Sequence, residues 1–178
     1  MRKVIFYSLF LMALGFFSCQ ENPKVVEQKK PRVFPEYSEA LDEIIRTKDG
    51  VIRGIDLNSK ADVITKTETK APSEVAHDYL YFEYAIDSLT NYSVAYNLQK
   101  DSLDEVEVQI NCQDLDLSAR LFTDLKTYYE KKLPNPTEDK GFVVYNCFEG
   151  QRKPFVVSLT DNSTPTMGII NLVIYRDK

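Results

Sequence analysis

Three successive stretches between residues 79 and 110 place an apolar side chain at every second position. A period of two puts alternate side chains on opposite faces of a β-strand, so each stretch would bury one face and leave the other in water. This pattern is typical of an antiparallel meander, because parallel strands are usually covered on both faces. The alternating positions are Leu80, Phe82, Tyr84 and Ile86, then Tyr92, Val94, Tyr96 and Leu98, then Val106, Val108 and Ile110.

Three further strands are predicted nearer the C-terminus, at 142–148, 155–160 and 167–175. The last of them reads Gly-Ile-Ile-Asn-Leu-Val-Ile-Tyr from Gly168 to Tyr175 and is apolar on both faces. We therefore expect it to be a central or doubly covered strand.

Helices are predicted in three places. Apolar side chains recur every three or four positions between Tyr37 and Ile45, and again most strongly over 117–132, which Asp114 and Asp116 would cap. A short helix at 60–69 is indicated by Ser59 to Asp62, which fit a capping box.

The order of these elements after residue 57 is helix, three strands, helix, three strands. We therefore predict an α+β fold in which helices pack on antiparallel β-sheet. The fold would consist of two similar halves, each a helix plus three strands, or of one sheet built from both sets of strands. No sequence repeat by identity supports a duplication. Residues 36–178 would form this single domain, and residues 19–35, with three prolines, would be a flexible linker that reaches roughly 50 Å.

The N-terminus has the order of a secretory signal. Arg2 and Lys3 precede an apolar run from Val4 to Phe17, which is shorter than the ~20 residues of a membrane-spanning helix. The other interpretation is a permanent transmembrane anchor. Phe16-Phe17-Ser18-Cys19 resembles the lipobox of bacterial lipoproteins, although Phe16 stands where leucine is usual.

This resemblance implies that residues 1–18 are removed and that Cys19 becomes S-lipidated and N-acylated. Two or more acyl chains, palmitate among them, give stable membrane anchoring. The expected location is the bacterial cell envelope, on the outer membrane, facing either the periplasm or the surface. Without Arg2 and Lys3 the 22 basic side chains fall to 20, against 27 acidic ones, so the mature chain carries a net charge of −7. Such a charge argues against a nucleic-acid partner, which requires a basic surface.

Cys112 and Cys147 are the two cysteines that remain after Cys19. In an oxidising compartment they would form a disulfide, or they would remain two separate buried thiols.

No catalytic or metal-binding signature is present. His77 is the only histidine, lies in a polar setting and has no Gly-x-Ser-x-Gly motif to accompany it. The segment from Asp56 to Asp62 begins like a calcium loop, but Lys60 stands where an oxygen ligand belongs. We predict neither an enzyme nor a cofactor.

Two pairs of residues are candidates for function. Tyr79 and Tyr81, if they face outward, would form a binding patch for a protein or a sugar ring, and otherwise they fill a strand beneath a helix. Asp87-Ser88-Leu89 and Asp101-Ser102-Leu103 resemble the Asp-Ser-aliphatic acceptor of a general O-glycosylation system of some Gram-negative envelopes. Asp and Ser are also ordinary turn residues.

The domain itself resembles β-lactamase-inhibitor-like proteins and the small lipoprotein subunit of the outer-membrane barrel assembly machine. The resemblance lies in Arg53-Gly54-Ile55 and in the helix end from Leu125 to Leu133-Pro134. It implies a binding scaffold. We therefore expect a membrane-anchored, non-catalytic module that binds an envelope protein or a cell-wall component, or alternatively one that captures glycans or peptides for uptake or wall attachment.

Overall fold

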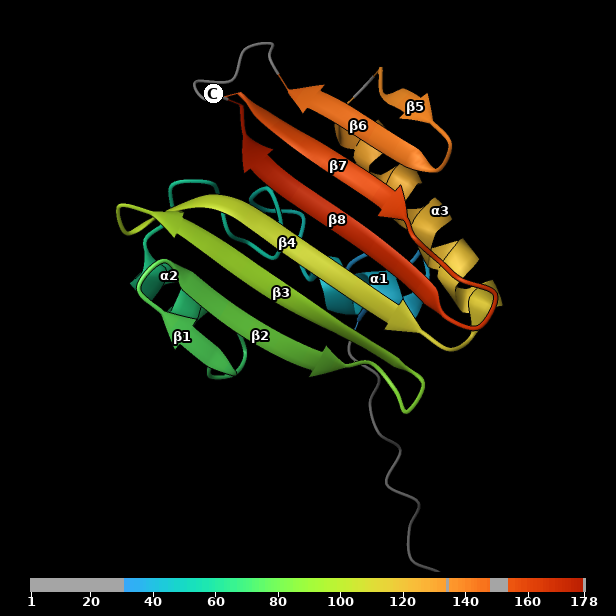
Figure 1. The fold of residues 1–178 in the computed structure, drawn as a ribbon, viewed down its shortest axis with the longest axis horizontal. Coiled ribbons are helices and arrows are strands. Elements are labelled where there is room, and N and C mark those ends of the chain that lie inside the picture. The colour runs from blue at the N-terminus through green and yellow to red at the C-terminus, as the bar shows by residue number, and fades with distance from the viewer. Residues whose placement is uncertain (1–30, 134, 148–153, 178) are drawn as a thin grey trace, which may run out of the picture. The chain divides into compact units, whose positions relative to one another are not determined.

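A single eight-stranded antiparallel sheet dominates the folded domain (Figure 1). The computed structural model describes residues 31–133, 135–147 and 154–177. The strands are β1 (Glu74–Ala76), β2 (Tyr79–Ala85), β3 (Thr90–Gln99), β4 (Ser102–Cys112), β5 (Thr137–Asp139), β6 (Phe142–Cys147), β7 (Phe155–Asp161) and β8 (Gly168–Arg176). Their order across the sheet is β1-β2-β3-β4-β8-β7-β6-β5.

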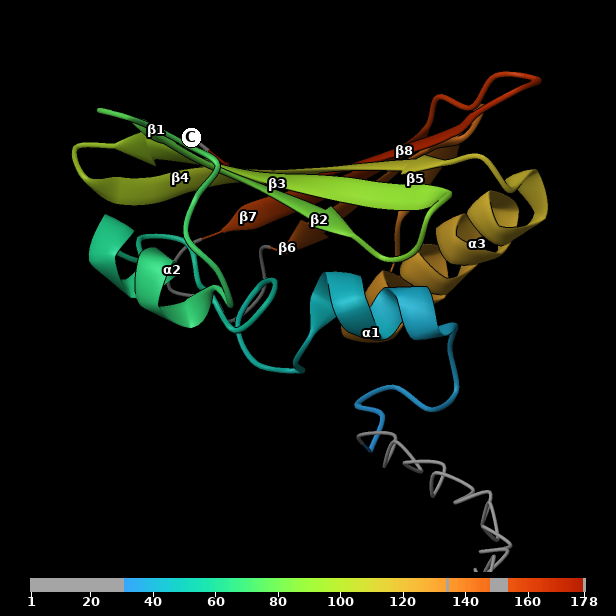
Figure 2. The same cartoon turned by 90° about the horizontal axis from the view of Figure 1, so that it is seen from below.

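The helices lie on one face of this sheet (Figure 2). They are α1 (Glu39–Ile45), α2 (Ala61–Thr67) and α3 (Leu115–Lys132). The longest, α3, packs against β4, β6, β7 and β8, and α1 packs against α3. We call the opposite face, which no described helix covers, the outer face.

The prediction of an α+β fold with helix-plus-three-strand halves is wrong. The two sets of strands form one continuous sheet, because β4 pairs with β8 from Glu105 opposite Tyr175 to Cys112 opposite Gly168. The helices are also a minor part of the fold, since α1 and α2 have seven residues each. The result is a fold dominated by its sheet, with a partial helical layer on one side.

The alternating side chains of the meander confirm which face is buried. Phe82, Val94, Tyr96, Val106 and Ile110 are all fully buried beneath the helices. The strand that is apolar on both faces, β8, lies in the middle of the sheet, as expected for a central strand. It also supplies Ile170, Leu172 and Ile174 to the core.

All six predicted strands are present, but the edge strands β1 and β5 were not predicted. Each has three residues, all exposed, so neither carries an alternating pattern.

Of the two predicted helix caps, one is present and one is not. Asp114 does cap α3, because its carboxylate accepts hydrogen bonds from the backbone amides of Asp116 and Leu117. The capping box at Ser59 does not form, since α2 begins after Lys60 without a side-chain cap.

Candidate binding face

Tyr79 and Tyr81 project from β2 on the outer face. Their neighbours in the strand, Leu80 and Phe82, are buried on the helix side, so the period of two turns both tyrosines outward. The rings stack on each other with centroids 5.9 Å apart and planes 15° apart. Both side chains are half-buried, which places a flat aromatic pair at the surface of the sheet.

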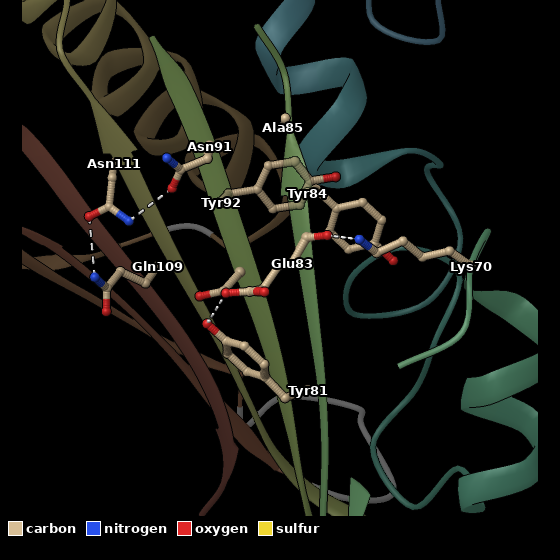
Figure 3. A pocket seen from close by; sticks show the side chains of 10 residues that line it. Lys70, Tyr81, Glu83, Tyr84, Ala85, Asn91, Tyr92, Gln109 and Asn111 are labelled. Atoms are coloured by element: carbon tan, nitrogen blue, oxygen red, sulfur yellow. Dashed lines mark hydrogen bonds between the residues drawn. The ribbon is translucent and has the colours of Figure 1, made fainter. Parts of the chain in front are cut away.

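The outer face is hollowed on both sides of Tyr81. A small hollow of about 200 Å³ is lined by Tyr79, Tyr81, Asn97 and Glu107, among other residues. A larger one of about 530 Å³ lies along the same three strands and has Tyr81 and Glu83 in its lining (Figure 3). Both hollows are shallow and open, so they suit a projecting side chain or a sugar ring better than an enclosed small molecule.

Side-chain amides form a row beside the tyrosines. Gln109 donates to the side-chain oxygen of Asn111 at 3.2 Å, and Asn111 donates to that of Asn91 at 3.2 Å (Figure 3). Nearer Tyr79, the amide of Asn97 donates to Glu105 at 2.9 Å and to Glu107 at 3.2 Å. These contacts hold the polar groups in fixed positions on β3 and β4, where they can exchange hydrogen bonds with a ligand.

The electrostatics of this region are acidic. Burial and then the neighbouring Glu105 carboxylate raise the pKa of Glu107, against the opposing hydrogen bond from Asn97. Burial and then the charge of Glu74 raise the pKa of Tyr79, to which the charges of Glu107 and Glu83 add. Both shifts disfavour additional negative charge, so the region is better suited to a cationic or neutral ligand.

Lys70 lies at the rim of the larger hollow. Its ammonium donates to the backbone carbonyl of Glu83 and lies 4.7 Å from the ring centroid of Tyr84 (Figure 3). The lysine therefore belongs to the edge of the sheet near β2, and it is not among the residues that line the small hollow.

A buried polar cluster lies on the opposite, helix-covered side and was not predicted from the sequence. The Glu68 carboxylate accepts hydrogen bonds from Nε and Nη2 of Arg53, both at 2.8 Å. It also accepts from Arg46 at 2.7 Å, from the hydroxyl of Tyr84 at 2.7 Å and from that of Tyr96. The side chains of Arg53 and Glu68 are both fully removed from solvent.

Arg53 extends this cluster to α1. Its Nη1 donates to the carbonyl oxygens of Glu43 at 3.0 Å and Ile44 at 2.9 Å, and to the hydroxyl of Tyr92 at 3.0 Å. The cluster thereby ties the ends of both short helices to β2 and β3. Its members bond to one another instead of to an open cavity, so we assign it a structural role.

The signal that would have revealed the cluster is the set of inward-facing tyrosines. Tyr84, Tyr92 and Tyr96 all occupy inward-facing positions of the alternating pattern. A buried tyrosine hydroxyl usually requires a hydrogen-bond partner. Three such hydroxyls on adjacent strands therefore indicate a buried polar group opposite them, although not which one.

The two cysteines are separate, buried thiols. Cys112 lies opposite Gly168 at the first residue of β8, whereas Cys147 lies opposite Phe155, which pairs with Arg176 at the last residue of β8. The length of β8 separates them by roughly 27 Å at about 3.4 Å per residue. Disulfide formation requires Cα atoms within about 7 Å, so the predicted alternative of a Cys112–Cys147 bond does not fit this fold.

The two Asp-Ser-Leu segments differ in exposure. Ser88 is exposed between β2 and β3, and the following Leu89 is 49% exposed. Ser102 is half-buried at the start of β4, its hydroxyl accepts from Lys60 at 2.9 Å, and Leu103 is fully buried in the core. Of the two predicted acceptors, Ser88 is therefore the accessible one, and its modification stays a prediction.

The other features considered from the sequence are His77, a metal site and a membrane anchor. His77 is exposed between β1 and β2. Within the described ranges, no group of three His, Cys, Asp or Glu side chains gathers as a metal site requires. None of the helices in that part of the chain combines the length and apolarity that a membrane crossing needs. Cys19 and its signal lie outside the described residues.

Comparison with known proteins identifies no relative: no family model matches the sequence, and neither a curated protein nor a solved structure is detectably similar to it. The function is therefore inferred from the chain's own residues.

Proposed function

We propose that this protein is a membrane-anchored lipoprotein of the bacterial envelope that acts as a non-catalytic binding module. Its anchor is Cys19, and its docking surface for a protein partner is the outer face around Tyr79 and Tyr81. The observation that carries the proposal is the stacked tyrosine pair on the sheet face that no described helix covers.

Physical reasons favour this role for the pair. Tyrosine offers a large apolar ring with a polar hydroxyl and few rotatable bonds, so it loses little conformational entropy on binding and is enriched at the centres of protein interfaces. The neighbouring β-strands hold both rings in place, which gives a preorganised surface.

A second candidate, the capture of a glycan, is favoured by the amide row. Gln109, Asn111 and Asn91 line a hollow that also contains the ring of Tyr81. Amide groups that both donate and accept suit the hydroxyls of a sugar, and an aromatic ring suits its apolar side. A glycan panel tested by thermal shift separates this candidate from protein docking.

The test of the proposal is crosslinking in intact cells that express a tagged copy, followed by identification of the co-purified protein. The Tyr79→Ala, Tyr81→Ala double variant should lose that partner. Phe142→Ala is the matched control, because Phe142 is 44% exposed on the same face but five strands away from β2 in the sheet order. Cys19→Ala tests the anchor.

A partner that is lost with the tyrosine variant and kept with Phe142→Ala supports the proposal. If every co-purified protein is retained by a tyrosine variant that is folded, as judged by circular dichroism, the outer face is not the docking surface.

A further inference from the structure

The strands of this protein carry almost no positive charge. Arg176 is the one basic residue in the described strands, and its guanidinium is engaged at the sheet end by the carbonyl of Leu103 at 2.9 Å and the carboxylate of Asp104 at 3.3 Å. Basic residues lie instead in loops and on the helices, such as Lys131 and Lys132 at the end of α3. The basic residues of the described chain therefore lie almost entirely outside the strands.

The outer face collects the negative charge. The strand register places five carboxylates on it, and no ion pair among the described residues involves any of them. They are Glu74, Glu83, Glu105, Glu107 and Asp139.

Two of these carboxylates lie side by side next to the tyrosine pair. Glu105 and Glu107 project from the same face of β4, and the amide of Asn97 donates to both. Glu107 lines the small hollow of about 200 Å³ together with Tyr79 and Tyr81. The hollow thus combines aromatic rings with the carboxylate of Glu107. The like charge of Glu105 lies next to Glu107 on the same face of β4.

On the basis of the proposed function, we infer that the partner presents a basic surface and inserts a lysine or arginine side chain into the small hollow between Tyr79, Tyr81 and Glu107. The carboxylates would accept charge-assisted hydrogen bonds from the cation. The tyrosine rings would contact its methylene groups and favour the cation electrostatically. A cation would also relieve the repulsion between Glu105 and Glu107, which a neutral ligand leaves in place.

Lys70, the lysine that lines the larger hollow, does not occupy this role. The ammonium of Lys70 is held by the carbonyl of Glu83 and the ring of Tyr84 at the rim of the larger hollow. It does not line the small hollow, so the charge of Glu107 remains available to a partner.

The experiment uses the full chain in detergent micelles and a dye-labelled peptide that contains six arginines, with binding followed by fluorescence anisotropy. We expect saturable binding that weakens at least fivefold in Glu107→Gln and weakens further as salt is raised, because exposed charges are screened. The matched control is Glu130→Gln, which removes the same charge from an exposed position on α3. Its binding should change less than twofold.

Equal losses in Glu107→Gln and Glu130→Gln would overturn the inference, since they would show attraction to net charge alone. Tighter binding of a neutral hexasaccharide than of the arginine peptide would overturn it as well. If the cellular partner is lost with Tyr81→Ala but kept with Glu107→Gln, this inference fails while the proposed function stands. If no partner depends on Tyr79 or Tyr81, the proposed function fails.

Discussion

Glu68 lies at the centre of the buried polar cluster. Its carboxylate is fully removed from solvent and is surrounded by two arginines and two tyrosine hydroxyls. Breaking a buried pair by removing one charge leaves the other charge without compensation in a low-dielectric interior.

Glu68→Gln should therefore destabilise the protein. The amide retains the shape of the side chain but leaves Arg53 buried without its counter-charge, so we expect the free energy of unfolding to fall by about 3 kcal/mol. Urea denaturation measures this change. Asp62→Asn is the control, because it breaks the exposed Asp62–Lys66 pair of the same short helix and should leave the urea midpoint nearly unchanged. Similar midpoints for both variants would contradict the structural role.

The same residue predicts a pH dependence. Burial alone would raise the pKa of Glu68, but the hydrogen bonds and charge of Arg53, together with the hydroxyls of Tyr96 and Tyr84, lower the pKa below its usual value. A lowered pKa in the folded state means that this stabilisation is present above the unfolded pKa of about 4.3 and is lost as pH falls through the folded value.

Stability measured from pH 6 downward should therefore decline in the wild type from about pH 5, and Glu68→Gln should show a shallower slope. Parallel slopes in the two proteins would show that other carboxylates govern the acid transition.

For single residues, the sequence predicts which face of the sheet a side chain occupies better than it predicts which residue that side chain contacts. Because side chains alternate along β2, Tyr79 and Tyr81 must lie on the outer face once Leu80 is placed in the core. The Arg53–Glu68 pair was not predictable, because it joins a loop to a helix end and depends on how both lie against β2 and β3.

At the scale of elements, α3 and β8 approach each other closely where Ser118 lies over Gly168. A Cβ atom added to Gly168 would lie 2.3 Å from Cβ of Ser118, closer than carbon atoms approach without a shift. Gly168 thus allows the first turn of α3 to lie directly on the start of β8.

Gly168→Ala should lower the free energy of unfolding by about 2 kcal/mol, because the added methyl group overpacks this contact. Ser118→Gly in the same chain removes the clashing atoms and should restore part of the loss, despite its own cost of about 0.5–1 kcal/mol in a helix. A double-mutant cycle in urea measures the coupling. If the changes in the free energy of unfolding are additive, Ser118 and Gly168 are not in close contact.

The strands of the meander were predictable because each alternates between a buried and a wet face, and β8 was predictable because it is apolar on both faces. The pairing of β4 with β8 was not, since these strands are separated by α3 and three other strands, and periodicity carries no information on which strands become neighbours. Because β4 pairs with β8, the strands of the two expected halves form one continuous sheet.

For the molecule as a whole, the described strands are held together without a disulfide bond. Cys112 and Cys147 lie at opposite ends of β8, and burial raises the pKa of Cys147, which lowers its reactivity further. We expect both thiols to be unreactive toward a thiol reagent in the native protein and reactive in denaturant, and the melting temperature to be unchanged by reductant. A melting temperature that falls with reductant would contradict the arrangement of the strands.

The proposed role of the outer face is to bind a protein partner at the tyrosine pair. Its most direct test is site-specific photo-crosslinking in living cells, with the photoreactive phenylalanine analogue benzoylphenylalanine at position 81 and, as the comparison, at the exposed position Thr123 on α3. We expect a discrete crosslinked protein from position 81 that is absent from position 123. No adduct at position 81, or the same adduct at both positions, would contradict it.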